Sequence, residues 1–294
     1  MWHSSRLKSA RMSLFKSGVF CAGTIVSSFV ILAYVEEQRL KNERKEQVNF
    51  WGKLQYYVGN LHSNTLKSHN AKFNNRLTWE LENTWSSLTS AQKTLSALIL
   101  ANTAVFIGWK IPALVPFMQR HFLHSPLSSP HTLLTSSFSH SSFLHLSFNM
   151  IALSAFGGWI HQELGREQFL FMYLSAAVTS SFVSQAWKVL VGRENMLHIP
   201  SLGASGAIMS LFAATAHRKD ISIGLILLPG IHVPSNVAVA GMAAVDAYCL
   251  LFRSATSRFD HAAHLGGSAF GYIYPIYIPK LLWENKRSIL GFDK

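Results

Sequence analysis

Long apolar blocks separated by polar stretches run through most of this chain, and several of them contain no charged residue. Ser17–Val35 and Gln168–Trp187 hold 19 and 20 uncharged residues, respectively. A hydrocarbon core of about 30 Å needs roughly 20 residues of α-helix. Both blocks therefore predict helices that cross a lipid bilayer.

The first apolar block stands apart from the others. After a polar stretch the chain turns apolar again, and six further spans fit approximately residues 94–116, 143–160, 168–188, 203–217, 235–252 and 261–279. We therefore predict an all-α polytopic membrane protein in which one N-terminal transmembrane helix precedes a six-helix bundle (1+6). The regions are a basic N-terminus (1–16), the extra helix (17–35), a polar and amphipathic linker (36–92), the six-helix domain (93–280) and a tail (281–294).

Composition supports a membrane protein and argues against nucleic-acid binding. The mean hydropathy is +0.20, with 49% hydrophobic and only 14% charged residues, which is too apolar for an ordinary soluble domain. The formal net charge is +12, but the basic residues are spread over the polar head and the loops, as is typical of membrane-flanking Lys and Arg. Cys21 and Cys249 lie far apart in apolar segments, so we expect no disulfide framework or Cys-rich metal site.

The extreme N-terminus, MWHSSRLKSARMSLFKSG, combines four basic residues and several serines with no acidic residue. This composition is typical of a mitochondrial presequence. A short cytoplasmic tail that obeys the positive-inside rule is the alternative. We favour the mitochondrial inner membrane as the location, with another organellar or cell membrane as the alternative.

The fourth bundle span is short. Polar residues 193–201 precede it and HRKD (217–220) follows, which leaves about 15 residues, or about 22 Å of helix, less than the hydrocarbon thickness. If Arg218 and Lys219 anchor its far end at one surface, its near end stops inside the membrane, and Ser205 lies there. Non-helical backbone at this depth must be buried in protein or face a water-filled cavity. A wet pocket around Ser205 is therefore expected.

Three polar residues lie near the starts of the second, fourth and sixth bundle spans, namely His145, Ser205 and His264. Consecutive spans alternate in direction, so these three starts share one leaflet. Small residues also line the fourth and sixth spans and allow their backbones to approach closely. That approach brings His264 beside Ser205. The small residues are Gly203, Gly206, Ser210, Ala263, Gly267 and Gly271.

A serine hydroxyl becomes nucleophilic when a neighbouring base removes its proton, and histidine is suited to this near neutral pH. The oxyanion formed on a carbonyl needs prearranged donors. Ser205 lies near a helix N-terminus, and His145 and Asn149, one helical turn apart, offer two further donors. No acid is required. Two acids are candidates nonetheless. Asp246, midway along the fifth span, is interpreted as a structural hydrogen-bonding residue, with a catalytic role as the alternative, and Asp260 and His261 are interpreted as interfacial residues at a helix start.

Three motifs together resemble the rhomboid family of intramembrane serine proteases. They are His140-x4-His145-x3-Asn149, GASGA (203–207) and AHLGG (263–267), in the family's order and on its second, fourth and sixth spans. Each motif alone is weak, because G-x-S-G also occurs in soluble hydrolases and in packing faces. Three in register are specific.

The resemblance covers about residues 94–290 and is strongest to the mitochondrial, presenilin-associated branch of the family. It rests on PSLGASGAIM (200–209), FDHAAHLGG (259–267), the GREQF–YLSA run (165–176) and the extra span ahead of the bundle. Many bacterial members carry a Trp-Arg pair before the second span. This chain has HFLHSPLSSPHTLL there instead, so the role of that pair is not transferred.

The resemblance implies a dyad of Ser205 as nucleophile and His264 as general base, with His145 and Asn149 completing the oxyanion hole beside the Ser205 amide. His140 supports this site, as do Gly203, Gly206 and Gly267. The implied substrates are single-span membrane proteins, cut in or near a transmembrane segment where small residues unwind it. The family uses no metal or organic cofactor. The implied partners are these substrates and the lipid bilayer, not nucleic acid, and the sequence indicates no oligomeric state.

Two alternative functions remain at this point. One is an inactive relative that binds transmembrane helices, although such relatives usually lack the serine or the histidine. The other is a proton-coupled transporter or channel, which would need a polar relay across the bilayer and often shows inverted repeats that this chain lacks.

The extra first span also bears on the orientation of the bundle. If the basic N-terminus faces the matrix, this span inverts the six-helix bundle relative to a bundle without it. The Ser205 site then opens toward the matrix leaflet.

Overall fold

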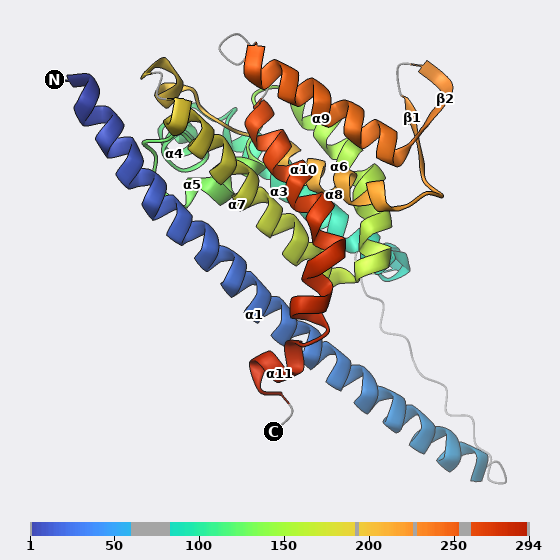
Figure 1. Cartoon of the computed structure of the whole chain (residues 1–294). Coiled ribbons are helices and arrows are strands. Elements are labelled where there is room, and N and C mark those ends of the chain that lie inside the picture. Colours follow the sequence, from blue (N-terminus) through green and yellow to red (C-terminus); the bar gives the residue numbers. More distant parts are fainter. Residues whose placement is uncertain (1, 60–82, 192–193, 226–227, 253–259, 293–294) are drawn as a thin grey trace.

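The chain forms a bundle of helices that one long helix crosses on the outside (Figure 1). The computed structural model describes residues 2–59, 83–191, 194–225, 228–252 and 260–292. The long helix, α1 (Trp2–Gly59), contains the predicted 17–35 span but extends past it in both directions. The basic N-terminus and the first part of the predicted linker thus continue the same helix. Residues 60–82 of the linker lie outside the described residues.

Each of the six predicted bundle spans corresponds to a helix. These helices are α3 (Ser90–Gly108), α6 (Phe143–Leu164), α7 (Arg166–Val191), α8 (Ser205–Ala214), α9 (Ser235–Phe252) and α10 (His261–Ile278). By length and apolarity, α1, α6, α7 and α9 each suffice to cross a bilayer, and α3 together with the helical turns after it makes a fifth, bent candidate. The prediction of an all-α polytopic membrane protein with an N-terminal membrane helix is confirmed.

The first bundle span ends earlier than predicted. It was expected to reach residue 116, but α3 ends at Gly108 and the chain bends by 96° into η1 (Pro112–Leu114) and α4 (Val115–His121). Pro112 lacks an N–H and disfavours helical backbone at the residue before it. Ile111 is accordingly extended. The proline therefore ends the straight span.

Short elements connect the long helices. They are α5 (Thr132–Thr135), η2 (Ser136–Phe138), η3 (Glu194–His198), η4 (Thr215–His217), the π-helical turn η5 (Pro279–Trp283), α11 (Lys286–Leu290) and the strands β1 (Ser222–Leu225) and β2 (Leu228–Pro234). The strands pair antiparallel, with Ser222 opposite Pro234 and Ile223 opposite Val233. This hairpin leads into α9 and lies beside the bundle (Figure 1).

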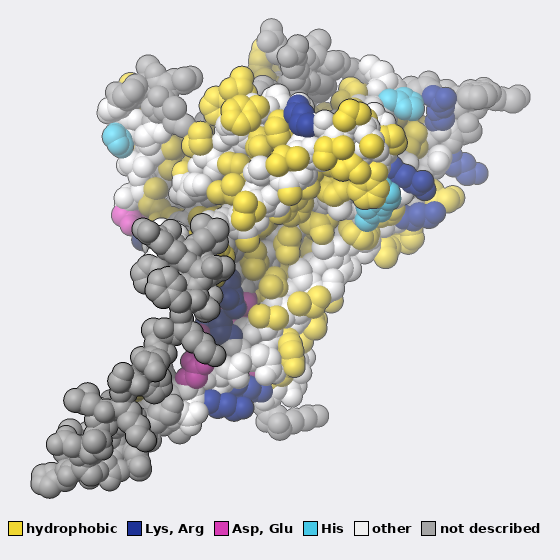
Figure 2. All heavy atoms as spheres, turned by 180° about the vertical axis from the view of Figure 1, so that it is seen from behind, with side chains coloured by type: hydrophobic (Ala, Val, Ile, Leu, Met, Phe, Trp, Pro, Cys, Tyr) yellow, Lys and Arg dark blue, Asp and Glu magenta, His cyan; other side chains and the backbone are white. Residues whose placement is uncertain are grey.

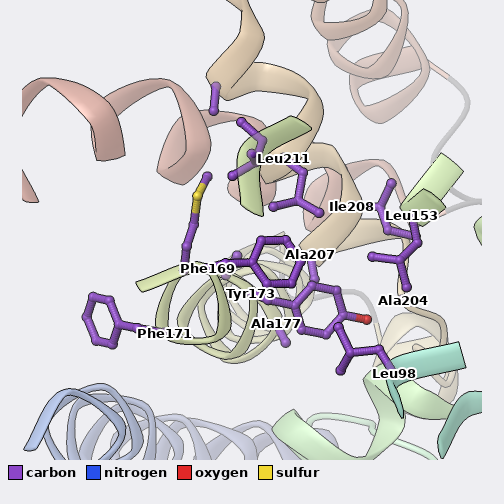
Figure 3. Packing of buried hydrophobic residues seen from close by; sticks show 14 of the residues in the cluster. Leu98, Leu153, Phe169, Phe171, Tyr173, Ala177, Ala204, Ala207, Ile208 and Leu211 are labelled. Carbon is purple, nitrogen blue, oxygen red and sulfur yellow. The ribbon is translucent and has the colours of Figure 1, made fainter. Parts of the chain in front are cut away.

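Helix α7 lies in the middle of the bundle. In its apolar segment 67% of the residues are buried, against 17% in α9. Phe169, Tyr173 and Ala177 of α7 pack in one cluster with Ala207 and Leu211 of α8 (Figure 3). The bundle is thus built around α7 and α8, with α9 at its edge.

The outer surface is largely apolar, as a lipid-facing surface must be. Figure 2 shows hydrophobic side chains over much of the described part of one face, with most of the charged ones toward its margins. Helix α9 contributes to the apolar exterior of the protein through Val237, Val245, Tyr248, Leu251 and Phe252, all strongly exposed. Little protein covers the outward side of α9.

Ion pairs fix α1 against α7 at one end. The buried Glu167 carboxylate accepts two hydrogen bonds from Arg39, each of 3.1 Å, and another of 2.6 Å from Arg166. Near the other end of α7, Gln185 donates to the Ser13 hydroxyl over 3.4 Å. The two helices therefore run antiparallel. The basic N-terminal end of α1 lies at the same end of the bundle as the segment between α7 and α8, which leads to Ser205.

Helices α8 and α10 approach so closely that no side chain fits between them. A Cβ atom added to Gly267 would lie 2.0 Å from the Gly206 carbonyl oxygen, and one added to Gly271 would lie 2.0 Å from that of Ser210. Carbon and oxygen atoms repel strongly at this distance, and both obstructing atoms belong to backbone that cannot rotate away. The glycines on α10 thus set the spacing of the two helices.

Replacing Gly267 by alanine should therefore destabilise the protein, because α8 and α10 must separate to admit the methyl group. We expect a loss of at least about 2 kcal/mol in the free energy of unfolding. Gly241→Ala on α9 is the matched control, since nothing lies within 4 Å of a Cβ added there. Thermal unfolding of both variants in detergent checks this. Equal midpoints for the two would show that the close approach is not required.

Candidate active site

Ser205 and His264 lie within hydrogen-bonding distance although 59 positions separate them. The Ser205 Oγ is 3.0 Å from the His264 Nε2. Ser205 is the first residue of α8, and His264 lies in the first turn of α10. The His264 side chain is 14% exposed. The α8–α10 contact at Gly206 and Gly267 lies directly beside this pair and holds the two helix starts together.

A tight turn carries Ser205 into this position. Gly203 has φ of 120°, a conformation that side-chain-bearing residues rarely adopt. Its N–H donates to the Ser136 carbonyl over 2.9 Å, and two backbone hydrogen bonds of 3.2 and 2.7 Å pair His124 with Ser201 just before it. The segment leading to α8 is therefore anchored to the connection between α4 and α6.

Asp260 anchors the start of α10. Its carboxylate accepts from the Ala263 N–H over 3.1 Å and from the Ser184 hydroxyl over 2.6 Å, and it also accepts from Ser201. The Lys188 ammonium lies 3.5 Å away. The sequence-based interpretation of Asp260 as an interfacial residue is incomplete. It does cap the helix start, but it also joins α10 to α7 and to the segment before Ser205.

The polar residues in and just before the start of α6 lie near the Gly203 turn. A Cβ on Gly203 would come within 2.9 Å of the His145 ring, so this ring packs directly against the turn. His140 is buried, and its ring meets that of His145 edge-on with centroids 4.9 Å apart. Asn149 Nδ2 donates to the His145 carbonyl over 2.8 Å, and an amide nitrogen has a second N–H to donate elsewhere. Of the predicted donors, the structure brings His145 to the turn, whereas Asn149 bonds within its own helix.

A polar pocket opens beside Ser205. Its lining includes Ser136, Ser180, Ser181, Ser201 and Asp260. Hydroxyl and carboxylate groups of this kind hydrogen-bond water readily. Helix α8 is even shorter than predicted, with 10 residues. The start of α8 therefore lies within the protein, beside a pocket that can accept water. The shortness of the fourth span in the sequence led to the same expectation.

Asp246 contacts the same imidazole from the other side. This residue of α9 is only 2% exposed, and its Oδ1 lies 3.1 Å from the His264 Nδ1 and 2.6 Å from the His261 Nδ1. A hydrogen bond accepted by Asp246 agrees with its sequence-based interpretation, but the donor is the histidine that faces Ser205. Neither Asp246 nor His261 was predicted as part of the site. One feature of the sequence could have pointed to Asp246: it is a lone carboxylate in an apolar span. Such a group is costly in a membrane unless it has a hydrogen-bonding or charged partner.

The donor atoms of Asp246, His261 and His264 all lie within 4.8 Å of one another, a grouping that could in principle hold a metal ion. Zinc bonds of 2.0 to 2.2 Å in tetrahedral geometry keep ligand atoms about 3.3 Å apart. The Asp246–His261 separation of 2.6 Å is too short for this and is normal for a hydrogen bond. The arrangement is that of a carboxylate accepting from two imidazoles.

Comparison with known proteins places the chain in one family. The family model described as Rhomboid domain matches residues 128–280, which include His145, Ser205 and His264. Presenilin-associated rhomboid-like protein A, mitochondrial, of Danio rerio is 40% identical over 211 residues, covering 71% of this chain and 54% of its own length. The human presenilin-associated rhomboid-like protein, mitochondrial, is 34% identical over 283 residues, or 95% of this chain and 70% of its own.

A fungal relative shows the same likeness. Rhomboid protein 1, mitochondrial, of Saccharomyces cerevisiae is 34% identical over 205 residues, covering 68% of this chain and 57% of its own length. The match to the Danio rerio protein spans about half of that relative, at 54%. The family match, the mitochondrial relatives and the apolar helices lead to one conclusion. The chain belongs to the rhomboid family and is a multi-pass mitochondrial membrane protein.

Proposed function

We propose that this protein is an intramembrane serine protease of the mitochondrial inner membrane that cleaves single-span membrane proteins in or near their transmembrane segments. The observation that carries the proposal is the 3.0 Å separation between the Ser205 Oγ and the His264 Nε2 beside a polar pocket. Hydroxyl, base and a polar, water-compatible pocket are the components that peptide hydrolysis needs.

In the proposed reaction, His264 accepts the Ser205 proton as the hydroxyl oxygen attacks the substrate carbonyl carbon. The negative charge then develops on the carbonyl oxygen, where the backbone N–H groups at the start of α8 and the side chains of His145 and Asn149 stabilise it. His264 next protonates the leaving amine, and an acyl-enzyme remains on Ser205. Water from the polar pocket hydrolyses this ester with His264 again as the base.

A transmembrane helix shields its own peptide bonds, so a substrate must unwind locally to reach Ser205. Small residues in the substrate make this less costly because they favour non-helical backbone. The loosely covered α9 edge of the bundle offers a route from the lipid to the site. This combination supports single-span helices as the substrate class.

The alternatives fit the site less well. An inactive helix-binding relative would not need a serine and a histidine at 3.0 Å. In a proton-coupled transporter the polar groups would extend across the bilayer. Here Ser205, His264 and His145 lie at helix starts around one turn.

A fluorophosphonate probe tests the nucleophile, because it labels only serines that a neighbouring base activates. We expect the purified protein in detergent to be labelled, Ser205→Ala to show no labelling, and His264→Ala to be labelled at least about 100-fold more slowly. Gel fluorescence measures this. Labelling of Ser205→Ala at the rate of the unmodified protein would refute Ser205 as the nucleophile.

The proposed oxyanion donors predict a separate effect. His145→Ala and Asn149→Ala should each lower kcat for a cleaved transmembrane peptide by about 100-fold to 1,000-fold, since one donor to the developing charge is lost. Phe148→Ala, on the lipid-facing side of the same helix at 62% exposed, serves as the control and should retain full activity. Unchanged kcat in both donor variants would remove α6 from the proposed mechanism.

A further inference from the structure

The Asp246 carboxylate of α9 contacts His264 of α10, and His264 in turn contacts Ser205 of α8. Its Oδ1 accepts from the His264 Nδ1 over 3.1 Å, while the His264 Nε2 on the opposite side of the ring lies 3.0 Å from the Ser205 Oγ. Serine, imidazole and carboxylate thus form one continuous chain of hydrogen bonds. They come from α8, α10 and α9, respectively.

A carboxylate in this position determines which nitrogen of His264 carries the proton. An ionised carboxylate only accepts hydrogen bonds, so the facing Nδ1 must be the N–H donor. In this tautomer the Nε2 of the neutral imidazole carries a free lone pair. This is the tautomer that can remove a proton from Ser205. The opposite tautomer would point an N–H at the serine and could not act as a base.

His261 secures the carboxylate itself. Its Nδ1 lies 2.6 Å from the same oxygen and its ring is almost perpendicular to that of His264, at 84°. Both histidines lie on α10, one turn apart, whereas Asp246 is on α9. The carboxylate therefore receives two donors from one helix, which fixes its position relative to the His264 ring.

The burial of Asp246 is unusual for α9, because most side chains of this helix are exposed or only partly buried. Its side chain is 3% exposed, although α9 as a whole lies at the edge of the bundle and has few buried residues in its described part. A carboxylate in an apolar helix is costly and persists where it has partners or a function. For Asp246 the partners are the base facing Ser205 and the neighbouring histidine, so α9 is tied to α10 at the site.

We infer that Asp246 is a positioning residue of the proposed protease, which holds His264 in its basic tautomer and stabilises the imidazolium that forms during the reaction. The inference rests on the proposed function and deepens it from a serine–histidine pair to a three-residue relay supported by His261. It also makes the base dependent on α9. The tautomer of His264 is fixed only while α9 and α10 stay packed together at Asp246.

The test compares Asp246→Asn with the unmodified full chain in detergent, using a synthetic single-span transmembrane peptide that the unmodified protein cleaves. Asparagine has the same shape but no charge, and its N–H can face the imidazole and favour the wrong tautomer. We expect kcat to fall about 100-fold to 10,000-fold, with KM changed by less than about twofold. A purely structural role would not confine the loss to kcat.

Two further variants keep the test decisive even if Asp246→Asn is less stable. Asp246→Glu retains the charge and should be at least about tenfold faster than Asp246→Asn. Cys249→Ser changes polarity on the same helix and should match the unmodified protein in kcat. Equal kcat for Asp246→Asn and the unmodified protein would overturn the inference. So would equal losses in Asp246→Asn and Asp246→Glu, because the charge would then be irrelevant.

Ser205→Ala, measured in parallel, separates this inference from the proposed function. If the unmodified protein cleaves the peptide and Ser205→Ala does not, the proposed function stands, and Asp246→Asn alone decides the role of the carboxylate. If the unmodified protein cleaves no faster than Ser205→Ala, the proposed function fails, and the inference fails with it.

Discussion

The structure depends on the direct backbone contact between α8 and α10. Gly267 and Gly271 lie against the carbonyl groups of Gly206 and Ser210 so closely that a single added carbon atom would overlap them. Because the two backbones are in direct contact, the first turns of the two helices are held at a fixed distance. The Ser205–His264 hydrogen bond lies at that end of the contact, so its geometry follows from backbone packing rather than from the two side chains alone.

Polar groups inside the bundle are stabilised by one another. Asp260 accepts from Ser184 of α7, from Ser201 in the segment before α8 and from the backbone at the start of α10, so three segments meet at one carboxylate. On the other side of His264, the Asp246 carboxylate accepts from His261 and His264 and so joins α9 to α10. Isolated charges would be unstable in a lipid-surrounded bundle. Each is therefore found where helix starts converge, and the resulting rigidity favours a preorganised site.

Helix α1 adds a long contact on the far side of α7, away from this convergence. Its ion pairs with Glu167 and its aromatic packing of Phe29 against Phe171 and Trp283 hold it to the outside of the bundle. The α9 edge stays open to lipid. An extra helix is thus accommodated without covering the side from which the proposed substrates would enter.

The sequence by itself determined the helical class and the approximate positions of the six bundle helices, and it predicted the approach of Ser205 and His264, because apolar length, small-residue spacing and alternating direction are properties of the linear chain. It also predicted that the start of α8 lies inside the membrane, since the polar residues on either side leave about 15 residues, too few to span it. The bend after Gly108 could have been anticipated from Pro112. Its size could not, because the angle depends on what the following turns pack against.

Only the tertiary structure decided which further polar residues join Ser205 and His264. Asp246 lies midway along α9, and no spacing rule connects it with the first turn of α10. Its contact with His264 depends on the tilt and rotation of α9 against α10. The contribution of Asn149 likewise depends on which way its amide turns, and here it bonds to its own helix. Side-chain direction and helix rotation arise from packing across the bundle, which a linear pattern does not contain.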